Sequence, residues 1–189
     1  MTAGKGCAGR VGPVLVPYDP IWPHRFEEAA RAISSACGKR IVAVEHIGST
    51  AVPGLAAKPV LDVMPGLRAD EDGGRMVEPM AALGYEYRGE FGIPGRHYFT
   101  RPIEDDSHVV KHHVHAYPIG HPEWVRHLAF RDALRRDPLV ATEYAQLKHA
   151  LAARHHDDVE AYAAAKTAFI DRIVAELGGP PRRVRDTVQ

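Results

Sequence analysis

Two neighbouring stretches contain the residue types that phosphate chemistry requires. The first runs from His46 to Thr50 and ends an expected strand in a Gly48-Ser49 turn; the second carries Asp62 on the next expected strand. Backbone amides at a glycine-serine turn surround a phosphate group, and a carboxylate nearby holds a metal ion against it. The sequence therefore predicts a site for a phosphate group and a metal ion.

Three further side chains are candidates for the same ligand. Thr50 follows the turn, either as a ligand contact or as the N-cap of a short helix. Lys58 precedes Asp62 by four residues, so it either pairs with that carboxylate or contacts a phosphate. Arg96 follows a Gly-Ile-Pro-Gly turn, which presents its guanidinium to a phosphate or to a surface ion pair. We assign these side chains and the turn to substrate binding: Gly48, Ser49, Thr50, Lys58 and Arg96.

A histidine pair on another expected strand, residues 108–117, supplies a second group. Alternation along a strand puts Lys111, His113 and His115 on one face and apolar side chains on the other. Two imidazoles and Asp62 suit Zn²⁺, Fe²⁺ or Mn²⁺, and they equally suit acid–base catalysis. A solvated sheet face is the alternative. On the functional interpretation Asp62, His113, His115 and Lys111 are catalytic, and the first three hold the metal.

Hydrophobic periodicity indicates the elements that position these residues. Strands are expected over residues 41–47, 59–67, 85–90, 97–101 and 108–117. Helices are expected over residues 22–37, 70–83, 122–136, 139–155 and 157–177. The fold class is α/β (α+β): a small mixed sheet packed by helices, with a C-terminal helical segment. We expect a flexible leader at 1–12, one domain over 13–177 with its sheet core to about residue 120 and a helical cap at 122–177, and a flexible tail at 178–189.

Composition narrows the classes of molecule and surface that the protein is expected to bind. The 189 residues contain 24 Lys+Arg and 24 Asp+Glu, so there is no broad basic field for nucleic acid. No apolar run is long enough to span a bilayer, and the first residues lack a signal peptide's apolar block. We expect Cys7 and Cys37 to be free thiols in a reducing compartment. We therefore expect a cytoplasmic protein with a nucleotide or phosphorylated small molecule as partner. The hairpin around Gly92 exposes a sheet edge, which favours a homodimer.

Several motifs in order resemble the GrpB-like family. They cover residues 13–175 and are Val16-Pro-Tyr-Asp-Pro-x-Trp-Pro23, Glu45-His-Ile-Gly-Ser-Thr50, Val52-Pro-Gly-Leu55, Lys58-Pro, Asp62, Gly92-Ile-Pro-Gly-Arg96, Tyr98-Phe99, His113-Val-His115, Phe130-Arg-Asp132 and the helix around Tyr144 and Lys148. The resemblance implies the polymerase-β-like nucleotidyltransferase fold. Fusion of a similar domain to dephospho-coenzyme A kinase in some proteins implies nucleotide or coenzyme A metabolism.

The chain departs from active nucleotidyltransferases in its acids. Those enzymes carry a second carboxylate two residues after the first, on the same strand face, where this chain has Met64. A thioether does not bind Mg²⁺, a hard cation that prefers oxygen, so standard two-metal transfer is in doubt. Glu90 is a weaker candidate for the missing acid.

Three functions stay open. The first is a divergent nucleotidyltransferase-like enzyme that uses Mg, Mn or Zn and acts on a nucleotide or phosphorylated small molecule. The second is a nucleotide-binding accessory domain without catalysis. The third is a mononuclear metal enzyme built on Asp62, His113 and His115.

Overall fold

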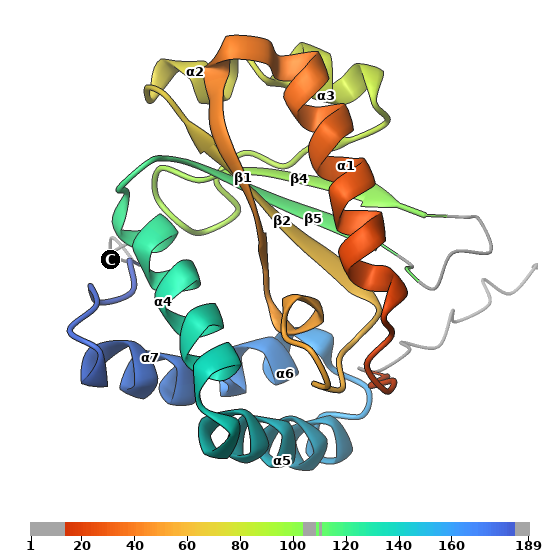
Figure 1. The fold of residues 1–189 in the computed structure, drawn as a ribbon, viewed down its shortest axis with the longest axis vertical. Coiled ribbons are helices and arrows are strands. Elements are labelled where there is room, and N and C mark those ends of the chain that lie inside the picture. Colours follow the sequence, from red (N-terminus) through yellow and green to blue (C-terminus); the bar gives the residue numbers. More distant parts are fainter. Residues whose placement is uncertain (1–13, 104–108, 110, 184–189) are drawn as a thin grey trace, which may run out of the picture.

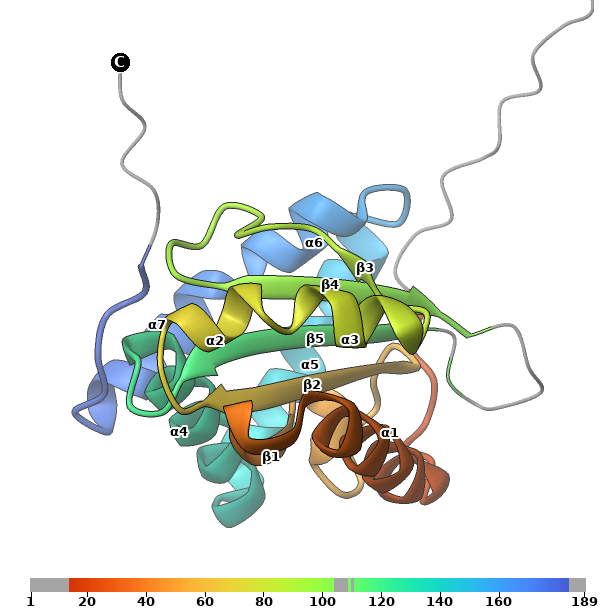
Figure 2. The same ribbon diagram turned by 90° about the horizontal axis from the view of Figure 1, so that it is seen from above.

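The computed structural model describes residues 14–103, 109 and 111–183, and within this part of the chain five strands form one mixed sheet. The strands are β1 (Ile41–Ile47), β2 (Val60–Leu67), β3 (Glu86–Tyr87), β4 (His97–Pro102) and β5 (Lys111–Pro118). Their order across the sheet is β1-β2-β5-β4-β3 (Figure 2). β2 and β5 run parallel, whereas the other neighbours are antiparallel. The two strands that carry Asp62 and the histidine pair are therefore direct neighbours.

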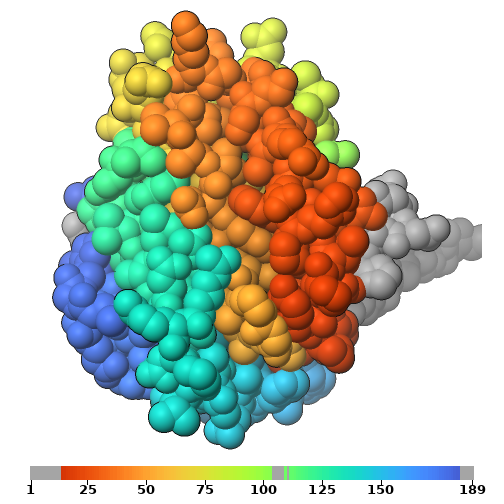
Figure 3. All heavy atoms as spheres, in the orientation of Figure 1, coloured from red at the N-terminus to blue at the C-terminus, as the bar shows by residue number. Residues whose placement is uncertain are grey.

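Helices cover both faces of the sheet (Figure 1). They are α1 (Ile21–Cys37), α2 (Glu71–Gly74), α3 (Val77–Ala82), α4 (Pro122–Arg136), α5 (Pro138–Arg154), α6 (Val159–Ala165) and α7 (Thr167–Glu176). The helices α1 and α3 pack on one face, and α4 with its neighbours α5 and α7 covers the other. In the space-filling view the segment after β1 (orange) lies between α1 (red) and the α4–α5 pair (green to teal) (Figure 3). The expected mixed sheet with a C-terminal helical segment is confirmed.

Alternate residues of β2 and β5 belong to two separate cores. Leu61 and Val114 join the cluster under α1 and α3. Met64 and Tyr117 pack with Trp124 of α4 on the opposite face. This alternation is the predicted one, and it leaves Asp62 and both histidines of β5 on the α4 side. The sequence pattern thus determined which face carries the candidate site.

Three elements differ from the expected ranges. The helix expected over 70–83 breaks into α2 and α3 after Gly73-Gly74, a pair that weakens a helix. Glycine at position 73 lets the chain pass His97, since a Cβ there would stand 2.1 Å from the imidazole. The helix expected over 157–177 divides at Lys166 into α6 and α7. The strand expected over 85–90 contains only Glu86 and Tyr87.

Part of the expected tail packs against the helices. Arg126 donates to the Pro180 carbonyl oxygen at 3.2 Å, and the Arg183 amide donates to Glu123 Oε1 at 2.7 Å. The buried Arg126 guanidinium therefore holds residues 180–183 beside α4. The leader at 1–12, Cys7, residues 108 and 110 of the expected last strand and residues 184–189 lie outside the described residues.

Two further sequence expectations concern redox state and membranes. Cys37 is a free cysteine, fully buried in the core under α1. No helix in the described segments is long and apolar enough to span a bilayer.

Candidate metal and phosphate site

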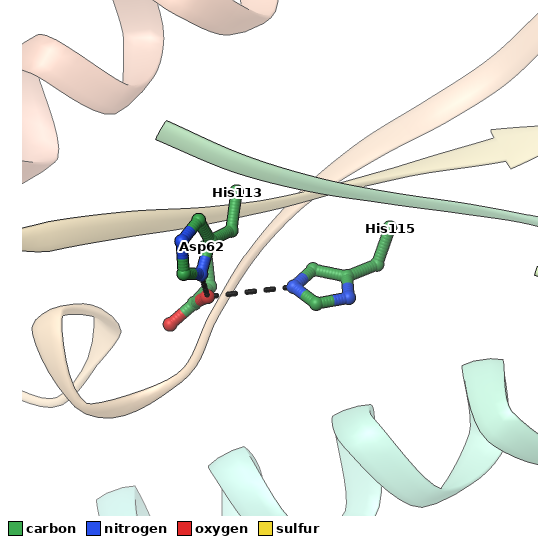
Figure 4. Close-up of side chains that lie close together, drawn as sticks. All are labelled: Asp62, His113 and His115. Carbon is green, nitrogen blue, oxygen red and sulfur yellow. Dashed lines mark hydrogen bonds and ion pairs between the residues drawn. The ribbon is translucent and has the colours of Figure 1, made fainter. Parts of the chain in front are cut away.

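Asp62 and the two histidines of β5 meet at one point (Figure 4). Asp62 Oδ1 lies 3.6 Å from His113 Nδ1 and 3.4 Å from His115 Nε2. The strand register explains this contact, because Asp62 pairs directly with His113 across the parallel β2–β5 ladder. Side chains two residues apart on one strand share a face, so His115 joins them. The predicted convergence of Asp62, His113 and His115 is present in the structure.

The glycine-serine turn closes the site from the side of β1. Gly48 follows β1 with φ +71°, a conformation that side chains disfavour, and Ser49–Ala51 form a 3₁₀ turn, η2. A Cβ on residue 48 would stand 2.2 Å from Asp62 Oδ2. Glycine is thus required both by the backbone angle and by the approach of the carboxylate. The turn and Asp62 form one unit.

A cavity of about 340 Å³ opens onto these residues. This size is in the range of small-molecule sites. Residues of the sheet side and of the helical segment both line it, among them Gly48, Ser49, Asp62, His115, His127 and Lys166. We call this cavity the Asp62 pocket.

The two histidines keep Asp62 ionised. Burial by itself raises the pKa of Asp62, but the hydrogen bonds from His113 and His115, together with the charge these rings carry when protonated, outweigh it and hold that pKa well below its usual range. Burial lowers the pKa of His115 to about 4, against the opposing pull of Asp62. At neutral pH the site therefore contains a carboxylate facing a neutral His115 ring.

The donor set fits a single transition-metal ion. The three ligand atoms lie within 4.8 Å of one another, and donors bound at ~2.1 Å in a tetrahedron are separated by roughly 3.4 Å. Two nitrogens and one oxygen suit Zn²⁺ or Mn²⁺ better than Mg²⁺. A pair of Mg²⁺ ions does not fit, because Met64 is fully buried against Ile47, Tyr117 and Trp124.

Arg96 points into the protein instead of toward a ligand. Its guanidinium donates to the carbonyl oxygens of Glu90 at 3.0 Å and Phe91 at 2.7 Å and lies 4.5 Å from the Tyr98 ring centroid. Its Nη1 also lies 3.4 Å from His115 Nδ1. A guanidinium can only donate, so Nδ1 accepts and the ring proton of neutral His115 is on Nε2, facing Asp62. In this structure the Arg96 guanidinium therefore contacts its own loop and His115, and its contact with a ligand stays a prediction.

Two other candidates also have structural partners. Thr50 is buried, and its Oγ1 donates to the Val60 carbonyl oxygen at 3.1 Å and lies 3.1 Å from His46 Nε2. It is neither the cap of the turn, a position that Gly48 occupies, nor a residue of the pocket wall. Glu90 accepts a hydrogen bond from the Gly95 amide at 2.7 Å and thereby shapes its own loop. Neither residue replaces the missing carboxylate or contacts the cavity.

The remaining predicted residues lie around Asp62. Lys58 precedes β2, and its ammonium lies 5.9 Å from the centroid of the Tyr162 ring. Burial lowers the pKa of Lys58, the charge of Asp62 raises it, and Lys111 lowers it again. Lys111 is level with Val60 across the β2–β5 ladder, one strand repeat before His113. Both lysines therefore add positive charge on one side of the site.

Three residues of the helical segment were not predicted as site residues. His127 lines the pocket and donates through Nδ1 to the Glu123 carbonyl oxygen at 2.7 Å, which leaves Nε2 as an acceptor in the neutral ring. Lys148 donates to Ser49 Oγ at 3.2 Å, and Lys166 lines the pocket. Lys148 appeared in the sequence only as part of a resemblance to a family. No local pattern marks the other two, because helix packing alone brings them to Ser49 and Asp62.

Comparison with known proteins identifies the family. The model of the GrpB protein family matches residues 13–176. The chain belongs to the GrpB family. The UPF0157 protein YqkA of Bacillus subtilis is 40% identical over 82% of this chain, and a UPF0157 protein of Pseudomonas aeruginosa is 40% identical over 85%. This GrpB-family chain spans 44% and 65%, respectively, of the lengths of those two relatives.

Solved structures support the fold. The crystal structure of GrpB from Enterococcus faecalis matches with a TM-score of 0.78 and 40% identity, over 86% of this chain and 96% of that one. A cytoplasmic RNA terminal U-transferase matches with a TM-score of 0.51 and 14% identity, over 74% of this chain and 42% of that one. The second likeness shows the nucleotidyltransferase-like fold alone. A dephospho-CoA kinase of Mycolicibacterium paratuberculosis is 28% identical over 80% of this GrpB-family chain and 42% of the kinase.

Proposed function

We propose that this GrpB-family protein acts on a nucleotide or phosphorylated small molecule in the Asp62 pocket, with one transition-metal ion held by Asp62, His113 and His115. The observation that carries the proposal is the contact of one ionised carboxylate with two imidazoles, at 3.4 and 3.6 Å, where Asp62 and His115 line a cavity beside the Gly48 turn. Buried or half-buried carboxylates need such partners, and this set combines them with access to a ligand.

Each residue of the site has a chemical role in this proposal. A bound ion supplies a Lewis acid that polarises a phosphoryl oxygen or a water molecule. Asp62 and the imidazoles hold it, and Gly48 keeps the backbone clear of the carboxylate. Ser49 offers its hydroxyl to the phosphate, and Lys111 offsets negative charge on that side. In the metal-free site Arg96 contacts the His115 ring at Nδ1 and favours the tautomer with its proton on Nε2.

The ligand test uses calorimetry. We expect ATP, CTP or coenzyme A to bind with micromolar affinity in the presence of Mn²⁺ or Zn²⁺ and at least tenfold more weakly without it. Coenzyme A is included because of the likeness to a dephospho-CoA kinase. Asp62→Asn should abolish the metal dependence, while Asp157→Asn, at an exposed aspartate, should leave it intact. No heat from any combination would overturn the proposal.

A non-catalytic nucleotide-binding domain is the second candidate. The burial of Met64 favours it, because the position of the second carboxylate has become part of the core. This candidate predicts ligand binding that Asp62→Asn leaves unchanged, together with no turnover of the bound ligand by chromatography. Stoichiometric Zn, Mn or Fe in the purified protein, measured by elemental analysis, favours the enzyme instead.

A further inference from the structure

Three lysines from separate parts of the chain lie near one another, and one of them, Lys166, lines the Asp62 pocket. Lys58 precedes β2, Lys148 belongs to α5, and Lys166 separates α6 from α7. The Lys58 and Lys166 ammonium groups lie 5.9 and 4.4 Å from the centroid of the same ring, that of Tyr162. Lys148 lies 5.0 Å from the Tyr144 ring centroid and donates to the Ser49 hydroxyl. We call these residues the lysine cluster.

The lysine cluster has no carboxylate partner in the structure. Over residues 14–103, 109 and 111–183, no ion pair within 4.0 Å joins any of the three ammonium groups to an acid. Burial, and to a smaller extent the charge of Lys166, lowers the pKa of Lys148 to about 7. Burial and the charge of Lys58 lower the pKa of Lys166 to about 8, against the opposing effect of Asp62. The charge of Asp62 partly offsets Lys58 and Lys166. Grouped cations removed from water are costly to hold together, so an additional anion between them would stabilise the cluster.

The cluster is connected to the pocket at two points. Lys166 and Ser49 both line the cavity that also contains Asp62 and His115. Lys148 is 1% exposed, so it does not reach the cavity itself. It holds Ser49 by donating to its hydroxyl and to the Ala56 carbonyl oxygen, which makes it a positioning residue. Lys166 is the member of the cluster that lines the cavity, and Lys58 lies beside it at the Tyr162 ring.

We propose that the lysine cluster binds the diphosphate or triphosphate portion of the ligand, beside the metal-holding residues. This inference rests on the proposed function and narrows its ligand class. Lys58 and Lys166, together with the neighbouring Lys111, place three ammonium groups on this side of the site, whereas a single phosphate group carries up to about two negative charges at neutral pH. Two or three linked phosphates supply more charge, and they extend from Lys166 toward Asp62 along one cavity wall. Monophosphates and uncharged nucleosides satisfy only part of this arrangement.

The test compares inorganic pyrophosphate with inorganic phosphate by calorimetry on the whole protein, without added metal. We expect pyrophosphate to bind at least tenfold more tightly than phosphate. Lys58→Met and Lys166→Met should each weaken pyrophosphate binding at least tenfold, whereas Lys39→Met, at an exposed lysine after α1, should not. Equal affinity for both anions, or pyrophosphate binding that neither substitution weakens, overturns the proposal.

A second measurement separates this inference from the proposed function. Co²⁺ binding, followed by its visible absorption, should persist in Lys166→Met and disappear in Asp62→Asn. Pyrophosphate binding without metal should persist in Asp62→Asn and be weakened in Lys166→Met. Pyrophosphate binding without any Co²⁺ site supports the lysine cluster and removes the metal part of the proposed function. A Co²⁺ site without pyrophosphate binding supports the metal part of the proposed function and overturns the lysine-cluster proposal. Far-ultraviolet circular dichroism of each variant confirms that it is folded.

Discussion

Gly48 and Asp62 touch across two strands that are joined by a long loop. The backbone of Gly48 lies so close to the Asp62 carboxylate that an added Cβ would stand 2.2 Å from Oδ2. The same carboxylate faces His113 and His115 through its other oxygen. A side chain at residue 48 would therefore displace the Asp62 carboxylate and change its distance to both imidazoles. The glycine of the turn controls the geometry of the metal-holding residues.

Gly48→Ala should damage both stability and metal binding. We expect a positive-φ alanine to cost about 1–2 kcal/mol in unfolding free energy. The collision with Asp62 should add about 1–3 kcal/mol. Gly38→Ala is the matched control, because Gly38 also has a positive φ of 60° but no atom within 4 Å of its added Cβ. Urea unfolding and Zn²⁺ titration of both variants measure the difference. Equal losses in the two variants would contradict the coupling of Gly48 to Asp62.

Met64→Asp should not restore a two-metal site. Met64 is fully buried among Ile47, Tyr117 and Trp124, so an aspartate there loses apolar packing and gains no partner. We expect a loss of about 3–5 kcal/mol in the free energy of unfolding. Met64→Leu keeps the volume and should cost under about 1.5 kcal/mol. A Met64→Asp protein as stable as Met64→Leu, with a second bound metal ion, would show that our account of this position is wrong.

Arg96→Met should leave metal affinity unchanged or raise it. A metal ion on His115 Nε2 requires the ring proton on Nδ1, the atom that Arg96 Nη1 now faces at 3.4 Å. Removing the guanidinium relieves that conflict, although the loop from Glu90 loses two hydrogen bonds and about 1–3 kcal/mol of stability. Competition with a chelator measures Zn²⁺ affinity. Arg88→Met is the control, since Arg88 pairs with Glu86 and Thr100 outside the site. A tenfold fall in affinity specific to Arg96→Met argues against this tautomer.

His46 should make the protein sensitive to acid. Burial, only partly opposed by the charge of Asp62, lowers its pKa from 6.5 to about 4. The unfolded chain therefore binds this proton at a higher pH than the folded one, so stability is lost as pH falls from about 6.5 to 4. The full effect amounts to about 3 kcal/mol. In His46→Gln the loss of unfolding free energy between pH 7 and 4.5 should be smaller by roughly 2 kcal/mol.

His156→Gln, at an exposed histidine, is the control for that measurement. It should keep the wild-type dependence of stability on pH, because the side chain of His156 is exposed and lies outside the core. The pKa of His115 is also lowered, to about 4. Because His115 is present in both variants, its contribution to the pH dependence of stability cancels in the comparison. Identical pH profiles for wild type and His46→Gln would show that His46 does not control acid sensitivity.

Much of the candidate site was readable from the sequence because strand alternation is local. His113 and His115 are two residues apart, so one strand puts them on one face without any knowledge of the fold. The apolar alternation of Leu61, Val63 and Val114 indicated which face turns toward α1. The loop geometry was less readable. The sequence shows that Arg96 follows a glycine-rich turn, but it does not show whether the guanidinium points outward or inward. Only the positions of the Glu90 and Phe91 carbonyl oxygens show that it points inward.

The sequence by itself determined the strands, the faces of Asp62 and the histidine pair, and membership of one family, since these depend on short-range periodicity and on motifs in order. Only the tertiary structure decided that Lys148 contacts Ser49 and that Lys58 and Lys166 meet at the Tyr162 ring. It also decided that Met64 belongs to the core and that Gly48 touches Asp62. Those contacts join residues far apart in the chain. They arise from how α4–α7 pack on the sheet, a packing that depends on the combined shape of many side chains.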